Sequence, residues 1–107
     1  MYGSYHRIVN ASKMDAPKES VAVAGNICES GDVFTGNGPD AARLVANPVI
    51  GDCVAIMDTG AYGLSMASQY NLREVPAEIL VENKNIEVIR RRQEFGDLVV
   101  NFNWFDG

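Results

Sequence analysis

Short apolar runs of strand length, each bounded by turn-forming residues, restrict this chain to a mainly β fold. The clearest is "AEILVENKNIEVIRRR" at 77–92. It predicts a β-hairpin because β-branched and aliphatic residues lie on both sides of the turn segment Asn83-Lys84-Asn85. Its strand residues are Ile79, Val81, Ile86 and Val88. Further strand candidates are "YHRIVNA" (5–11), "VAVAGNI" (21–27), "DCVAIMD" (52–58) and "DLVVNFNWF" (97–105).

Two segments interrupt the strand pattern. In "GPDAARLVANP" (38–48), Pro39 and Asp40 are start signals and Asn47-Pro48 is a stop signal, which predicts one or two helical turns. "YGLSMASQYN" (62–71) is a second short helix candidate. We therefore expect an all-β chain in the main, folded as a small β-barrel or sandwich with one or two short helices.

Length and composition are those of one ordinary globular domain. The chain has 107 residues, of which 47% are hydrophobic and 21% charged, and no apolar run reaches the ~20 residues of a membrane span. Its N-terminus has no features of a secretion signal, so we expect a cytoplasmic location. A net charge of -5 argues against nucleic-acid and membrane partners.

Cysteine and basic residues give weaker signals. Cys28 and Cys53 could form one disulfide, but two cysteines make no framework, and with His6 as the one histidine we expect no metal site. Cys53 lies within an apolar run and is expected in the core. "IRRRQ" (89–93) is the one basic cluster, for which a solvated or interface role is favoured over anion binding.

Three motifs carry a resemblance to a known family. They are "GNICESGDVFTG" (25–36), "GDCVAIMDTGAYGLSMASQYNLREVPAEILV" (51–81) and "VIRRRQEFGDLV" (88–99). Together with the opening "MYGSYHRIV", they closely resemble the C-terminal part of the diaminopimelate decarboxylases, fold-type III pyridoxal-phosphate enzymes related to alanine racemase and ornithine decarboxylase. The resemblance runs from Tyr2 to about Val99, and it does not account for the tail 101–107.

The resemblance implies a fold and a function. It implies that residues 1–107 are the C-terminal β domain, like that of alanine racemase-type enzymes, of an enzyme that converts meso-2,6-diaminopimelate to L-lysine and CO2. Family members carry the cofactor lysine and the phosphate-binding loops on an N-terminal α/β barrel. Lys13, Lys18 and Lys84 lie in no segment that resembles the cofactor-lysine motif. We therefore expect the barrel to be absent and this chain alone to be inactive.

Site residues are also implied by the resemblance. Cys28 is expected to be the proton donor to the decarboxylated carbon, in an active site shared across a dimer. This suits a thiol beside the Glu29 carboxylate, which disfavours a second negative charge. Glu29 is expected to bind the distal ammonium of the substrate, Tyr2 its carboxylate, and Tyr62 both the substrate and the phosphate of pyridoxal 5'-phosphate.

Plainer interpretations remain for these residues. Cys28 is then a small buried hydrophobe, Glu29 an exposed strand-end residue and Tyr62 a core tyrosine beside a glycine turn. His6 is expected to be a hydrogen-bonded structural histidine. Two other functions stay open: a sister decarboxylase for arginine or carboxynorspermidine, and a stand-alone β module that binds a partner or assembles.

A homodimer or larger homo-oligomer is expected. The surfaces of residues 26–36 and 58–70 would face protein in the full enzyme, so Phe34, Leu64 and Met66 should be exposed in this chain. An open edge strand would add a second adhesive surface.

Overall fold

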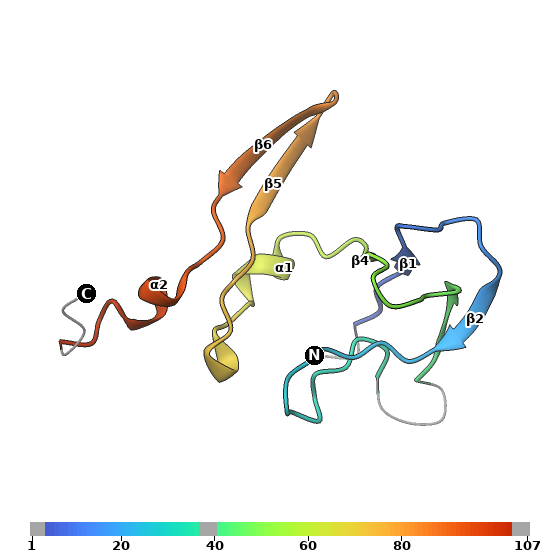
Figure 1. Cartoon of the computed structure of the whole chain (residues 1–107), viewed down its shortest axis with the longest axis horizontal. Helices are drawn as coiled ribbons and strands as arrows, with labels where there is room; N and C mark the ends of the chain where they lie inside the picture. Colours follow the sequence, from blue (N-terminus) through green and yellow to red (C-terminus); the bar gives the residue numbers. More distant parts are fainter. Residues whose placement is uncertain (1–3, 37–40, 104–107) are drawn as a thin grey trace. The chain divides into compact units, whose positions relative to one another are not determined.

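The computed structural model describes residues 4–36 and 41–103. The chain divides into two compact units, Met1–Ala61 and Tyr62–Gly107, which are described separately below. Three two-stranded antiparallel sheets and two short α-helices make up most of the regular structure (Figure 1). The mainly β character is confirmed, whereas the described residues form no closed barrel.

Two strand pairs form the first unit. The strand β1 (Ile8–Asn10) pairs with β4 (Val54–Ile56), and β2 (Lys18–Val21) pairs with β3 (Arg43–Ala46). A side-chain bond joins the two pairs, because Asn10 at the end of β1 donates from Nδ2 to the Ala46 carbonyl of β3 at 3.2 Å. The strands predicted at 5–11 and 52–58 are therefore confirmed, while the strand predicted at 21–27 lies earlier in the chain, at 18–21.

A small mixed core holds the first unit together. Its buried members are Ile8, Asn10, Thr35, Val45 and Ala46. Buried polar groups need partners, and the amide of Asn10 also donates to Asp52 Oδ2 at 2.8 Å while its Oδ1 accepts from the Ser12 N–H at 3.0 Å.

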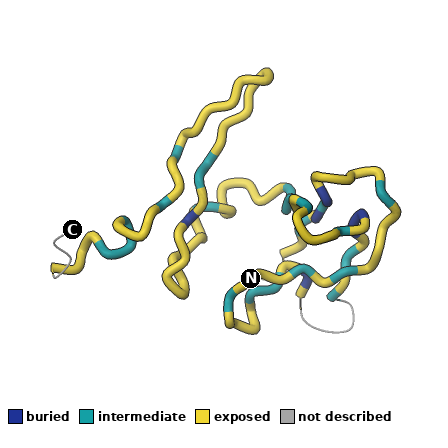
Figure 2. The backbone as a smooth tube through the Cα atoms, viewed as in Figure 1, coloured by how far each residue is buried: buried dark blue, intermediate teal, exposed yellow. Residues whose placement is uncertain are grey.

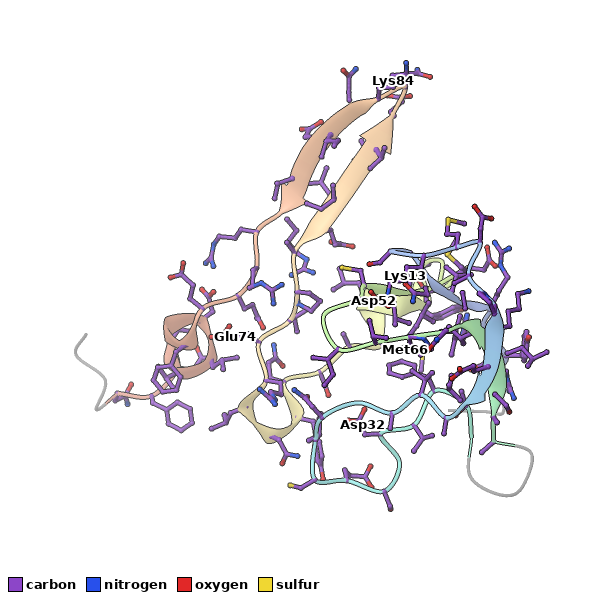
Figure 3. The ribbon with its side chains drawn as sticks, turned by 45° about the vertical axis from the view of Figure 1, so that its right-hand side comes forward. Lys13, Asp32, Asp52, Met66, Glu74 and Lys84 are labelled. Carbon is purple, nitrogen blue, oxygen red and sulfur yellow. The ribbon has the colours of Figure 1, made fainter. Side chains whose placement is uncertain are left out.

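The carboxylate of Asp52 holds the turn that leads into β4 through hydrogen bonds and an ion pair. Its Oδ2 accepts from the Val49 N–H at 3.0 Å and forms an ion pair with Lys13 Nζ at 3.2 Å (Figure 3). The Val49 bond, followed by the bond from Asn10, lowers the pKa of this carboxyl below its usual value. The turn 49–52 is thereby tied to the end of β1.

A long hairpin dominates the second unit. The helix α1 (Tyr62–Ser65) and the 3-10 turn η1 (Tyr70–Leu72) lead into β5 (Glu78–Glu82) and β6 (Asn85–Arg90). The hairpin is exposed along most of its length (Figure 2). The predicted hairpin and the predicted helix near 62–71 are both confirmed.

Side-chain bonds close the base of this hairpin. Arg90 Nε pairs with Glu78 Oε2 at 2.9 Å. The buried Val75 exchanges bonds with Gln93, because its N–H donates to Gln93 Oε1 at 2.9 Å and its carbonyl accepts from the Gln93 N–H at 3.1 Å. These contacts hold together the two segments that flank the hairpin.

Three further sequence predictions are wrong. Residues 43–46 form β3 rather than a helix, because they pair with β2 far away in sequence; Pro39 and Asp40 of that prediction lie outside the described residues. The strand expected at 97–105 is also not found, because residues 97–99 belong to the helix α2 (Phe95–Val99), which begins at a capping box between Glu94 and Asp97; residues 104 and 105 lie outside the described residues. Cys53 is exposed rather than in the core.

Candidate functional site

The Cys28 loop, defined as residues 25–32, is closed at its base. An isolated bridge joins Ala24 to Val33, and the Gly25 N–H donates to the Asp32 carbonyl at 2.9 Å. The buried Thr35 accepts the Val23 N–H on its Oγ1 at 3.2 Å. The loop is therefore a hairpin-like excursion with an anchored base.

The tip of this loop presents a thiol and a carboxylate on adjacent residues. Cys28 and Glu29 are both exposed. The carboxylate of Glu29 turns back on its own loop, where Oε1 accepts from the Gly31 N–H at 3.0 Å and from Ser30 Oγ at 3.3 Å. These bonds orient an exposed carboxylate that forms no ion pair with the described residues, so it has the capacity to accept from a cationic ligand.

A second carboxylate, that of Asp32, forms a hydrogen bond within the Cys28 loop. Its Oδ2 accepts from the Ile27 N–H at 3.0 Å, and its own N–H donates to the Glu29 carbonyl at 3.1 Å (Figure 3 labels Asp32). Asp32 and Ile27 are half-buried, whereas Cys28 and Glu29 are exposed. The loop thus has one exposed carboxylate, that of Glu29, and one that is bonded to the backbone, that of Asp32.

Tyr62 opens α1 in the second unit and is 73% exposed. The turn before it contains Asp58 and Gly60 at φ values of 58° and 55°, a left-handed conformation that costs little at glycine. This exposure argues against a core tyrosine and leaves the phenol accessible to an oxygen acceptor.

The predicted site residues divide into three groups. Cys28 and Glu29 are brought together on one loop of the first unit. Tyr62 belongs to the second unit. Tyr2 lies outside the described residues. Asp32 is a further residue of the loop that the motif alone does not single out, although aspartate beside glycine in a turn commonly bonds to nearby backbone.

The remaining candidates have structural partners. His6 is half-buried, and its Nδ1 lies 3.1 Å from the Met57 carbonyl, as expected of a structural histidine. Within the basic cluster, Arg90 pairs with Glu78 and Arg91 forms two bonds to Asp97, at 2.6 and 2.7 Å. These ion pairs leave less of the cluster to attract an anion.

The described residues contain neither a metal-ligand cluster nor a helix that could span a membrane. No group of three or more metal-ligating side chains is found in the described ranges. Among the same residues, no helix has the length and apolar character needed to cross a membrane. Both cysteines are described, and no disulfide joins them.

Comparison with known proteins places the chain in a family. Residues 1–60 match the family model described as "Pyridoxal-dependent decarboxylase, C-terminal sheet domain". This match covers more than half of the chain and includes the Cys28 loop. The chain belongs to this family of C-terminal sheet domains.

Two similar proteins are diaminopimelate decarboxylases of archaea. The chain is 50% identical over 102 residues to a diaminopimelate decarboxylase of Methanothermobacter thermautotrophicus, covering 92% of this chain and 22% of that protein. It is 48% identical to that of Archaeoglobus fulgidus, covering 92% of this chain and 23% of the relative. It therefore spans less than a quarter of the length of these two relatives.

Solved structures give the same result. A crystal structure of diaminopimelate decarboxylase aligns with a TM-score of 0.82 at 42% identity, covering 94% of this chain and 25% of that chain. The enzyme from Helicobacter pylori, complexed with L-lysine, aligns with a TM-score of 0.73 at 38% identity, covering 92% and 23%.

Proposed function

We propose that this chain supplies the C-terminal sheet domain of a diaminopimelate decarboxylase, which releases CO2 from meso-2,6-diaminopimelate to give L-lysine. The observation that carries the proposal is the Cys28 loop, which presents an exposed thiol beside an exposed carboxylate within a pyridoxal-dependent decarboxylase domain. Identities of 48–50% to enzymes of that name support it.

Cys28 is the proposed proton donor. Decarboxylation leaves a carbon that must take up a proton, and a positioned general acid accelerates such a step. The exposed thiol at the loop tip delivers that proton, and the carboxylate of Glu29 accepts the distal ammonium of the substrate. A substrate with a second amino group is therefore favoured over a substrate that lacks it.

Pyridoxal phosphate, when bound, supplies the electron sink for loss of CO2. The donors that this chain presents fit the rim of such a site. The exposed phenol of Tyr62 has the hydrogen-bonding capacity to donate to a phosphate oxygen. No lysine of this chain is proposed as a covalent anchor: Lys13 is paired with Asp52, and Lys18 in β2 and Lys84 in the hairpin turn lie in no segment that resembles the cofactor-lysine motif.

A homodimeric or larger assembly completes the proposal, with the Cys28 loop reaching the active site of a partner subunit. Phe34 and Met66 are 50% and 46% exposed, as a surface that faces protein would require. Leu64, expected with them, is half-buried. The alternative of a stand-alone binding module predicts the same exposure without any enzymatic activity, so activity has to be measured.

A graft tests the proposed function. This chain replaces the matching segment of the Methanothermobacter diaminopimelate decarboxylase, and lysine and CO2 are assayed with pyridoxal phosphate present. We expect the chimera to act on meso-diaminopimelate and not on arginine or carboxynorspermidine. A folded chimera that binds the cofactor but releases no CO2, or that prefers arginine, would overturn the proposal.

A further inference from the structure

We propose that Asp32 is the positioning residue of the proton donor: its carboxylate accepts from the N–H of Ile27, the residue before Cys28, and so fixes where the thiol points. This inference rests on the proposed function of Cys28. It assigns different tasks to the two carboxylates of the Cys28 loop, with Glu29 toward the substrate and Asp32 toward the backbone.

The contacts of Asp32 all close the loop on itself. Its Oδ2 accepts from the Ile27 N–H at 3.0 Å, one residue before the thiol. Its carbonyl accepts from the Gly25 N–H at 2.9 Å, and its N–H donates to the Glu29 carbonyl at 3.1 Å. One residue therefore connects the start of the loop, the peptide before Cys28 and the residue after it.

Gly25 gives independent support. A Cβ built at this position would lie 2.0–2.3 Å from the carboxylate atoms of Asp32, closer than any real contact. The backbone at residue 25 thus approaches the carboxylate so closely that a side chain there would require the carboxylate of Asp32 to move. Asp32 and Gly25 form a matched pair, in which a side chain at 25 would displace the carboxylate from the Ile27 N–H.

The placement of the two carboxylates argues against a direct substrate contact for Asp32. Asp32 is half-buried and its carboxylate is bonded to the Ile27 N–H, whereas Glu29 is exposed. Without the bond from the Ile27 N–H to Asp32, the Cys28 loop is also free to change conformation. Displacement of a reacting group by about 1 Å can lower a rate by about 10²-fold, so loss of the Asp32 contact should slow proton delivery without weakening substrate binding.

The first arm of the test uses this full chain without cofactor. Backbone amide hydrogen exchange is followed by NMR in Asp32→Ala, Asp32→Asn and Gly25→Ala. We expect faster exchange at the Ile27 N–H in Asp32→Ala and Gly25→Ala, and protection in Asp32→Asn, whose amide oxygen remains an acceptor. The matched control is Asp52→Ala, which should expose the Val49 N–H and leave Ile27 protected.

Unchanged exchange at Ile27 in Asp32→Ala would overturn the proposal. The same holds if Asp52→Ala accelerates exchange at Ile27 as much as Asp32→Ala does, because the effect would then reflect general loosening of the unit. This arm needs no activity, so it decides the contact even if the graft shows that the proposed function is wrong.

The second arm uses the active chimera and separates kcat from KM. Asp32→Ala should lower kcat by roughly 10- to 100-fold with little change in KM, and Asp32→Asn should restore most of the loss. Glu29→Gln should instead raise KM for diaminopimelate. An Asp32→Ala variant with raised KM and unchanged kcat would make Asp32 a substrate ligand and overturn its positioning role.

Discussion

At the scale of single residues, the two cysteines occupy chemically different places. Cys28 lies at the tip of an anchored loop beside a carboxylate. Cys53 lies where the β1–β4 pairing is extended, with its N–H donating to Ser12 Oγ at 2.9 Å and its carbonyl accepting from the Ala11 N–H at 2.8 Å. The backbone of Cys53 is thus fixed by groups that its side chain does not influence, so the two thiols should respond differently to replacement.

Replacement of Cys28 by alanine in the chimera should lower kcat by roughly 10²–10⁴-fold, the usual contribution of a general acid. KM should change little, because the thiol is proposed to act after the substrate has bound. Cys53→Ala is the matched control and should leave both constants close to those of the unaltered chimera. An effect of Cys28→Ala on KM alone would indicate a binding or packing role.

At the scale of secondary-structure elements, the β5–β6 hairpin has a two-residue turn with both residues in the left-handed region. Asn83 and Lys84 have φ values of 47° and 73°, and the register pairs Glu82 with Asn85. Such turns match the twist of the flanking strands and favour Asn-Gly. Asparagine tolerates this conformation at the first position, whereas lysine at the second is strained.

Lys84→Gly should therefore stabilise the second unit by up to about 1 kcal/mol in urea unfolding. Asn85→Gly, one residue further on and inside β6, should instead destabilise it by roughly 0.5–1 kcal/mol, because glycine loses more backbone freedom in a strand. Equal effects of the two substitutions would show that the left-handed turn does not form in solution.

An ion pair and backbone hydrogen bonds stabilise the start of α2 in the second unit. Asp97 accepts two hydrogen bonds from Arg91 and one from the Glu94 N–H. These contacts, with the bonds from Arg91 as the largest cause, lower the pKa of Asp97 from 3.8 to about 2. A carboxyl whose pKa is lowered by folding contributes stability above its unfolded pKa, and this contribution is lost as the pH falls through the folded value.

The start of α2 should accordingly loosen between about pH 4 and pH 2. Hydrogen exchange at the Glu94 N–H reports this change, since that group donates to Asp97 Oδ2 at 2.9 Å. Asp97→Asn should exchange faster than the unaltered chain near neutral pH and lose this difference by pH 2. Asp15→Asn, exposed in the first unit, is the control; a pH-independent difference would contradict the assignment.

Local signals explain which elements were predictable. The hairpin follows from its own turn and flanking residues, whereas β3 exists through pairing with β2, about 25 positions away, so its alanine-rich sequence favoured a helix. The capping box of α2 begins with Glu94 rather than with the usual serine or threonine. The apolar residues Leu98-Val99-Val100 therefore favoured a strand in the sequence. The sequence motif identified the thiol and carboxylate, but the contact of Asp32 with Ile27 required three-dimensional geometry.

At the scale of the whole molecule, the hairpin leaves one apolar face exposed. On this face Ile79 opposes Val88 and Val81 opposes Ile86, and all four are between 49% and 75% exposed.

This apolar face should drive self-association of the isolated chain. A two-stranded hairpin is marginal in water, and contiguous apolar patches of several hundred Å² tend to be covered. Light scattering at micromolar concentration should give a mass of at least twice 11.6 kDa. Ile86→Lys, which places a charge on the apolar face, should shift the mass toward the monomer. Glu87→Lys is the matched control, because Glu87 opposes Leu80 on the other face, and it should leave the assembly intact. A chain that stays a soluble monomer at every concentration would contradict self-association and favour a module that has evolved to stand alone.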